Sequence, residues 1–182
     1  MLKIIAFLFL SFSLLYASET SSVANKMPII VGGVLETGSG LLPEKTSHLG
    51  LVRISPLVGL WLNGMGYFRL AYAYNETTYK PENAPKINTT YHDFTSQLGV
   101  ALGYGPYLQV SYTKSKQLSD AGDVTWSELG FGLGTYFQLG PKTALISEIE
   151  YRSIFSHYNP LLNEETSGSR IQFNFGFVIY VY

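Results

Sequence analysis

The sequence predicts an all-β fold, an eight-stranded antiparallel up-and-down transmembrane β-barrel, and three observations lead to this prediction. Apolar and polar side chains alternate along most of the chain. Tight turns alternate with longer polar connections. Only 14% of the residues are Asp, Glu, Lys or Arg, whereas a soluble domain usually carries about 25%. We therefore expect something other than water to cover part of the surface.

The first residues are typical of a secretory signal peptide. Lys3 gives a positive start, residues 4–15 form a short apolar run, and Leu15-Tyr16-Ala17 resembles a small-residue cleavage site. The run is shorter than the roughly 20 residues that a membrane-spanning helix needs. We expect a signal peptide over 1–17, a short periplasmic lead-in over 18–26 and one barrel domain over 27–182.

Turn signals separate eight segments of alternating polarity, and bacterial single-chain barrels require an even number of strands. The predicted strands cover 27–36, 47–62, 65–79, 89–104, 106–117, 124–139, 142–155 and 170–182. Asn63-Gly64, Gly105-Pro106 and Gly140-Pro141 mark tight turns. The other connections are longer and polar, over about 37–46, 80–88, 118–123 and 156–169. Short turns on one side and longer loops on the other predict that both termini lie in the periplasm.

The two faces of each predicted strand differ in chemistry, since successive side chains point to opposite sides. In the last strand the odd-numbered residues from Ile171 to Val181 are apolar, whereas Arg170, Gln172 and Asn174 share the other face. The polar faces are rich in Gly and Ala and carry no lysine between the turns. This pattern favours an apolar side in lipid and a narrow, filled interior, because an eight-stranded barrel has room inside only for side chains.

All four arginines and four strand acids fall on the polar face. Because buried guanidinium groups need carboxylate partners, we expect an interior ion-pair network. Its predicted members are Arg53, Arg69, Asp93, Glu128, Glu148, Glu150, Arg152 and Arg170. We interpret Glu148 and Glu150 as part of this network rather than as an acid–base pair. A charge on the lipid side at mid-membrane costs about 2–4 kcal/mol, and the apolar faces carry none there.

Aromatic residues are expected at both membrane interfaces, where Tyr and Trp favour the headgroup level; the alternative is ordinary β-propensity. The predicted interface residues are Trp61, Tyr67 and Tyr104 on the turn side, and Tyr72, Tyr74, Tyr112, Trp126, Tyr151 and Phe155 on the loop side. Lys114 and Lys116 share the outward parity near the loop end of the fifth strand. Two roles are open for these lysines, contact with lipopolysaccharide phosphates or protection of a solvated strand end.

Several motifs resemble the small OmpA/OmpX-like outer-membrane β-barrel family. They are Leu129-Gly130-Phe131-Gly132-Leu133-Gly134, the Gly140-Pro141 turn and Ile149-Glu150-Tyr151-Arg152. The resemblance covers about residue 27 to the end and implies a Gram-negative outer-membrane location. The final Tyr180-Val181-Tyr182 resembles the C-terminal signal read by the barrel-assembly machinery, although strand parity directs Tyr182 inward. The expected partners are outer-membrane lipid, lipopolysaccharide, the barrel-assembly machinery and an extracellular partner of unknown type.

The predicted function is that of a non-enzymatic surface protein whose outer loops contact a partner. No cysteines are present, and His48, His92 and His157 lack metal-site spacing, so we expect no metal and no cofactor. The net charge of −1 gives no reason to expect nucleic-acid binding. A wide diffusion pore is not expected, since side chains fill the interior.

Two alternative functions remain open. One is a lipid A-modifying outer-membrane enzyme, for which His157-Tyr158-Asn159 is the nearest motif, although Asn159 stands where such enzymes place a serine. The other is a soluble periplasmic lipocalin-like carrier.

Overall fold

The computed structural model of this protein describes residues 28–41, 49–62, 65–79, 87–102, 105–119, 122–159 and 163–181. At 38–41, 49–52, 77–79 and 87 the description covers the backbone alone. The predicted signal peptide, the lead-in, His48, Tyr104 and Tyr182 lie outside the described residues. The described part of the chain contains no helix long and apolar enough to cross a membrane.

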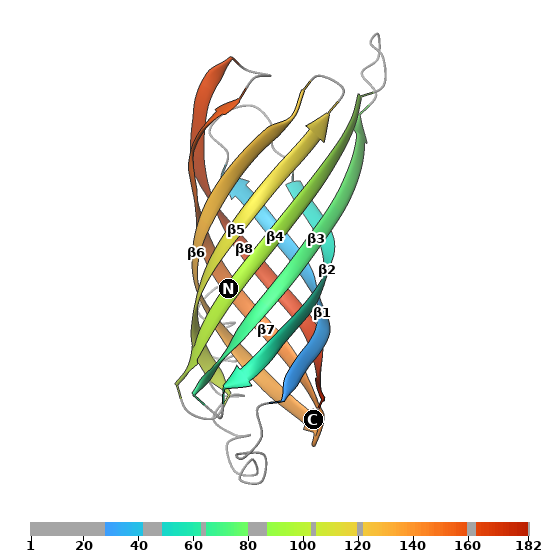
Figure 1. The fold of residues 1–182 in the computed structure, drawn as a ribbon, viewed down its shortest axis with the longest axis vertical. Coiled ribbons are helices and arrows are strands. Elements are labelled where there is room, and N and C mark those ends of the chain that lie inside the picture. The colour runs from blue at the N-terminus through green and yellow to red at the C-terminus, as the bar shows by residue number, and fades with distance from the viewer. Residues whose placement is uncertain are drawn as a thin grey trace.

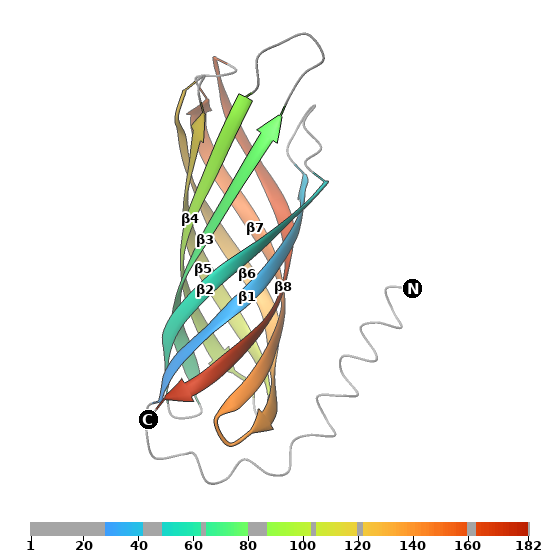
Figure 2. The ribbon, with the colours of Figure 1, turned by 90° about the vertical axis from the view of Figure 1, so that its right-hand side faces the viewer.

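Eight antiparallel strands follow one another around a closed barrel in chain order, which confirms the predicted fold. The strands are β1 (Ile29–Leu41), β2 (Leu49–Leu62), β3 (Gly66–Tyr79), β4 (Ile87–Ala101), β5 (Pro106–Ser119), β6 (Val124–Gly140), β7 (Thr143–Asn159) and β8 (Glu164–Val181). β1 closes the ring by pairing with β8, from Ile29↔Val181 to Leu41↔Ser169. Figures 1 and 2 show the start of β1, the end of β8 and the turn between β6 and β7 at one end of the barrel, called here the turn end; the opposite end is called the loop end.

Two of the turn-end connections have described residues at the predicted signals. β6 and β7 are joined by Pro141 and Lys142 alone, between the paired residues Gly140 and Thr143. Gly105 has φ +102°, a conformation that glycine adopts without steric cost, immediately before Pro106. Asn63 and Gly64 lie outside the described residues, but the Met65 amide donates to the Leu62 carbonyl across them at 2.8 Å.

The prediction of a loop over 156–169 is wrong, because β7 continues to Asn159 and β8 begins at Glu164. The two strands pair as far as Asn159↔Glu164, with a register shift between Ile154 and His157. That irregularity shifts the side-chain alternation, and the residues beyond it are mostly polar on both faces, so the sequence pattern of a strand is hidden. β1 likewise extends past its predicted end at 36, since its Gly- and Ser-rich end pairs with β8.

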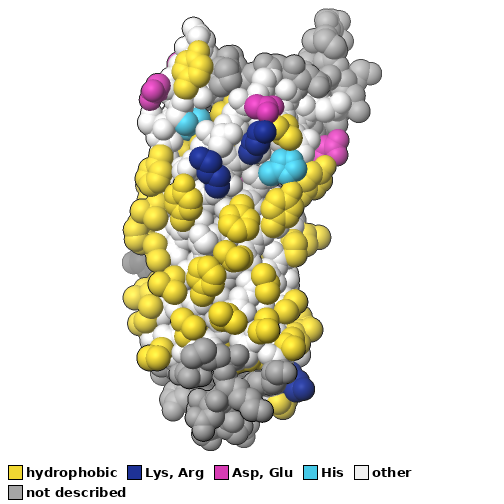
Figure 3. Space-filling view, in the orientation of Figure 1, with side chains coloured by type: hydrophobic (Ala, Val, Ile, Leu, Met, Phe, Trp, Pro, Cys, Tyr) yellow, Lys and Arg dark blue, Asp and Glu magenta, His cyan; other side chains and the backbone are white. Residues whose placement is uncertain are grey.

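The predicted separation of the two faces is confirmed. The odd-numbered residues of β8 from Ile171 to Val181 are exposed, whereas Gln172 and Asn174 are buried. Figure 3 shows the hydrophobic side chains spread over the middle of one face, and most of the charged and histidine side chains gathered near the loop end. The barrel therefore presents an apolar belt outward and places its polar groups inside.

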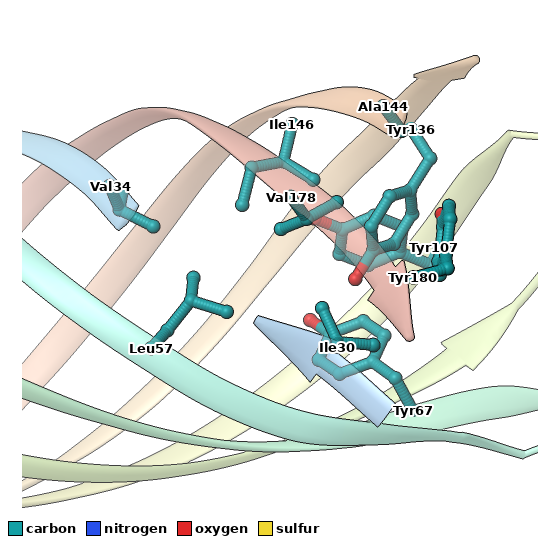
Figure 4. Packing of buried hydrophobic residues seen from close by; sticks show 10 residues of the cluster. All are labelled: Ile30, Val34, Leu57, Tyr67, Tyr107, Tyr136, Ala144, Ile146, Val178 and Tyr180. Atoms are coloured by element: carbon teal, nitrogen blue, oxygen red, sulfur yellow. The ribbon is translucent and has the colours of Figure 1, made fainter. Parts of the chain in front are cut away.

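The apolar part of the interior lies toward the turn end and combines four tyrosine rings with aliphatic side chains (Figure 4). Tyr67 packs edge-on against Tyr107, with ring centroids 5.0 Å apart, and Tyr107 lies 4.9 Å from Tyr136. Gly99 and Gly134 make this packing possible, because a Cβ on either would collide with the ring of Tyr67 or Tyr107 respectively. We call Tyr67, Tyr107, Tyr136, Tyr180 and the adjoining Trp61 the aromatic plug.

Three of the predicted membrane-interface residues instead point inward. Trp61 and Tyr67 belong to the aromatic plug, and Trp126 donates through Nε1 to the buried Glu128 at 2.8 Å. Trp61 and Tyr67 share the parity of the inward Arg53 and Arg69, and parity decides on which side of the wall a side chain lies. Tyr72, Tyr74, Tyr112, Tyr151 and Phe155 are exposed on the outer face, as predicted.

Candidate functional site

A chain of buried ion pairs crosses the interior of the loop-end half. Arg53 of β2 pairs with Glu36 of β1, Nη2 to Oε2 3.2 Å, and with Asp93 of β4. Arg170 Nη2 lies 3.7 Å from Asp93 Oδ2 and 2.7 Å from Glu128 Oε2. We call this set, completed by Arg152 and Glu150, the ionic chain. It links six of the eight strands through side chains alone.

The end of the ionic chain lies on β7. Arg152 Nε lies 2.6 Å from Glu150 Oε2, and Arg152 Nη1 lies 3.9 Å from Glu128 Oε2. The ionic chain contains four carboxylates and three guanidinium groups. Each guanidinium group of the ionic chain lies between two carboxylates, so none of its three arginines depends on a single carboxylate partner.

A second, separate ion pair lies nearer the turn end. Arg69 of β3 pairs through Nη2 with Glu148 of β7, and both side chains are almost fully buried. Arg69 Nη2 also donates to Gln97 Oε1 at 2.5 Å, and its guanidinium lies 4.3 Å from the Tyr67 ring centroid. Glu148 further accepts hydrogen bonds from the Tyr107 hydroxyl and from Asn174 Nδ2, the latter at 3.0 Å. This pair is thereby joined to the aromatic plug.

The structure places all eight residues of the predicted network inside the barrel and in ion pairs, but divides them between the ionic chain and the Arg69–Glu148 pair. Glu36 is a member that the sequence analysis missed. It shares its parity with the apolar, inward Ile30 and Val34 and stands at the predicted end of its strand. Strand parity was the signal that could have identified Glu36 as an inward residue. The inward residues before it are apolar, however, so the sequence does not reveal a polar inner face in β1.

On the outer face, a group of polar and aromatic residues lies near the loop end of β3 to β6, and we call it the cationic patch. Strand register aligns Tyr74 with His92 and His92 with Lys116, and in the next row Tyr72 with Phe94 and Phe94 with Lys114. These two lysines, predicted to face outward, are exposed. Among the described residues, these two lysines are the cationic side chains on the outer face of the loop-end half.

Short contacts organise the cationic patch. The Tyr72 hydroxyl lies 2.6 Å from His92 Nδ1, and the Tyr74 ring packs edge-on against the His92 ring at 5.4 Å. Lys114 Nζ and the Tyr112 hydroxyl both donate to Ser127 Oγ, at 3.3 and 3.0 Å. Lys116 Nζ lies 3.1 Å from Asp123 Oδ2, with both side chains about half exposed. The lysine charges are therefore accessible to an anion at the border of the apolar belt.

His157 does not lie in a hydrolytic arrangement. Its Nε2 lies 3.0 Å from Thr166 Oγ1, and its ring stacks on Trp126 at 5.6 Å. The neighbouring Ser156 hydroxyl donates to Glu165 instead of to the histidine. Within the described residues, no three His, Asp or Glu side chains are grouped to hold a metal ion.

Comparison with solved structures supports this fold. No protein-family model matches the sequence, and no curated protein sequence matches it. Among solved structures, Ail of Yersinia pestis in complex with the heparin analogue sucrose octasulfate is similar with a TM-score of 0.50 at 12% identity, covering 85% of this chain and 97% of that one. Neisserial surface protein A has a TM-score of 0.48 at 14% identity, with 84% and 96% covered. The N-terminal barrel domain of Pseudomonas aeruginosa OprF has a TM-score of 0.43 at 14% identity, with 85% and 99% covered.

Proposed function

We propose that this chain, which has the fold of the small eight-stranded outer-membrane β-barrels, is a non-enzymatic protein of the Gram-negative outer membrane. Its barrel anchors it in lipid, its cationic patch contacts lipopolysaccharide, and its outer loops contact an extracellular partner. One observation supports the membrane location most strongly. Most of the side chains that face outward in mid-strand are apolar and exposed, whereas the ion pairs are buried inside.

The energetics of a lipid environment agree with this arrangement. Exposed apolar side chains such as Phe175 and Phe131 would leave an extensive apolar surface in water. In lipid the same surface is favourable, and the closed ring pairs most of the backbone groups that hydrocarbon cannot solvate. This reasoning disfavours the soluble-carrier alternative.

Fractionation of Gram-negative cells that express the full chain tests the location. We expect the protein in the outer-membrane fraction, with a heat-modifiable shift in gel mobility that reports the folded barrel. A mature chain that stays folded and dissolved without detergent contradicts the proposal.

The proposed lipopolysaccharide contact rests on the two exposed lysines at the border of the apolar belt. In the Lys114→Ala/Lys116→Ala variant, lipopolysaccharide should raise the melting temperature less than in the wild type. Lys142→Ala, at the turn end, is the matched control and should respond like the wild type. Lipopolysaccharide without its phosphates should remove the difference. Equal stabilisation of all three proteins contradicts the contact and favours the alternative, two lysines at a solvated strand end.

The proposed lack of enzymatic activity has its own test. Purified protein incubated with lipid A should release no fatty acid. Release that disappears in the His157→Ala variant would establish the enzyme alternative instead.

A further inference from the structure

The wall of the barrel is open between β2 and β3 over the loop-end half. These strands pair only from Leu62↔Gly66 to Leu57↔Ala71. Beyond that point β2 continues to pair with β1 and β3 with β4, and the described residues include no further β2–β3 pair. Figure 2 shows β1 and β2 diverging there from β3 and β4. Two strand edges therefore border the opening.

Pro56 accounts for the position of the break. The Trp61 amide donates to the Pro28 carbonyl at 3.0 Å, toward β1. Because backbone groups alternate between the two sides of a strand, position 56 directs its backbone toward β3. The Ala101 amide donates to the Met65 carbonyl at 2.9 Å, so by the same alternation Tyr72 directs its backbone toward β2. The next hydrogen-bonded pair would be Pro56 with Tyr72, and proline lacks the amide hydrogen for it.

The open edges have the chemistry of a strand that lacks its neighbour. Beyond Pro56, the backbone groups of Ile54 and Tyr74 face the opening, and their side chains point outward with exposed fractions of 71% and 49%. Open strand edges of this kind readily pair with other chains. An extended polypeptide with apolar side chains therefore fits the opening, because it can complete the backbone pairing of both edges.

The interior behind the opening is sealed, so the occupant binds the edges and does not enter the lumen. Ser55 and Ala73, the inward neighbours of the edge residues, are buried. Arg53 joins Glu36 and Asp93 across the inner side of the break, from β1 and β2 to β4. These ion pairs connect the two sides of the break, where β2 and β3 make no backbone hydrogen bonds to each other in the described residues.

We infer that the open edges of β2 and β3 form an interface with a second copy of this chain. The two edges are suited to each other, because the same strands pair in the turn-end half. In two copies with parallel barrel axes, β2 of one runs antiparallel to β3 of the other. A two-fold axis along the membrane normal pairs both openings at once and closes the dimer. Pairing begins at Ile54 with Tyr74 of the second copy, beyond Pro56, so the absent amide is not needed.

Cysteine cross-linking tests the interface directly, since the chain contains no cysteine. Ile54→Cys and Tyr74→Cys chains, each with its own tag, are co-expressed and oxidised in isolated outer membranes. We expect a mixed disulfide dimer. The control is Val110→Cys with Phe131→Cys, outward neighbours in the intact β5–β6 ladder, which should give no mixed dimer. Absence of the mixed dimer, or an equal yield from the control pair, overturns the inference.

A second variant tests whether the break itself forms the interface. Pro56→Ala restores the missing donor, so the ladder should close within one chain. The Ile54→Cys/Tyr74→Cys double variant should then form a disulfide inside each monomer, and the mixed dimer should disappear. A mixed dimer that persists unchanged, or an internal disulfide already formed when Pro56 is present, overturns the inference.

This inference rests on the proposed membrane location, and the experiment keeps the two apart. Each variant is first checked for outer-membrane fractionation and for the heat-modifiable gel shift. A shifted, membrane-bound protein without the mixed dimer contradicts only the second-copy interface. Loss of the shift or of membrane association in the wild type contradicts the proposed function.

Discussion

The turn-end half of the barrel has an aromatic interior and a continuous wall, whereas the loop-end half has an ionic interior and a wall that opens between β2 and β3. The Arg69–Glu148 pair belongs to the first half and is enclosed by tyrosines and amides. The ionic chain belongs to the second half and shares each guanidinium group between two carboxylates. The difference indicates that an isolated buried pair and a shared network should respond differently to the loss of one member.

The comparison also separates two ways of holding a barrel together. In the turn-end half, backbone ladders join β2 to β3 as well as the other neighbouring strands, and ring packing and the Arg69–Glu148 pair fill the interior behind them. Where the ladder between β2 and β3 ends, Arg53 links β1, β2 and β4 through its two carboxylate partners. There, ion pairs between side chains join strands that backbone hydrogen bonds join elsewhere in the wall.

The largest expected effect is that of Arg69→Ala, which leaves the Glu148 carboxylate buried without its cation. Such a loss typically costs about 3–5 kcal/mol. Arg170→Ala should cost less, because its side chain is 16% exposed and Glu128 keeps Arg152 and Trp126 as partners. Urea unfolding in lipid vesicles, followed by tryptophan fluorescence, measures both. Equal losses would remove the distinction between an isolated pair and a shared network.

A smaller effect is expected from Gly134→Ala, which sharpens the role of the aromatic plug. The added methyl group collides with the Tyr107 ring, and overpacking of this kind typically costs about 1–3 kcal/mol. Gly33→Ala is the matched control, since its Cβ would meet only Ser55 O at 3.9 Å. The same unfolding assay should separate the two variants, and similar stability would show that the plug is loosely packed.

The smallest expected effect is that of Trp126→Phe at the loop end. The substitution keeps an aromatic ring beside His157 but removes the hydrogen bond from Nε1 to Glu128. Because Glu128 retains two arginine partners, we expect a loss of about 0.5–1.5 kcal/mol, the net worth of one hydrogen bond. The melting temperature in detergent is the readout, and a loss as large as that of Arg69→Ala contradicts the comparison.

Much of the architecture was predictable, since strand parity and turn signals are local properties of the chain. The outward face of β8 and the inward arginines follow from a period of two, whereas the turn between β6 and β7 follows from the turn residues Gly140-Pro141. The errors arose where parity was not applied or was disturbed. Trp61 and Tyr67 were assigned by their height in the barrel, and the register shift after Ile154 hid the continuation of β7.

The sequence by itself determined which side chains face outward and which face the interior, because alternation along a strand requires no knowledge of its neighbours. Only the tertiary structure decided which arginine meets which carboxylate, since most of those contacts join side chains from different strands within the interior. It likewise decided that the wall opens beside Pro56. A proline takes effect there only because strand register turns its missing amide toward β3.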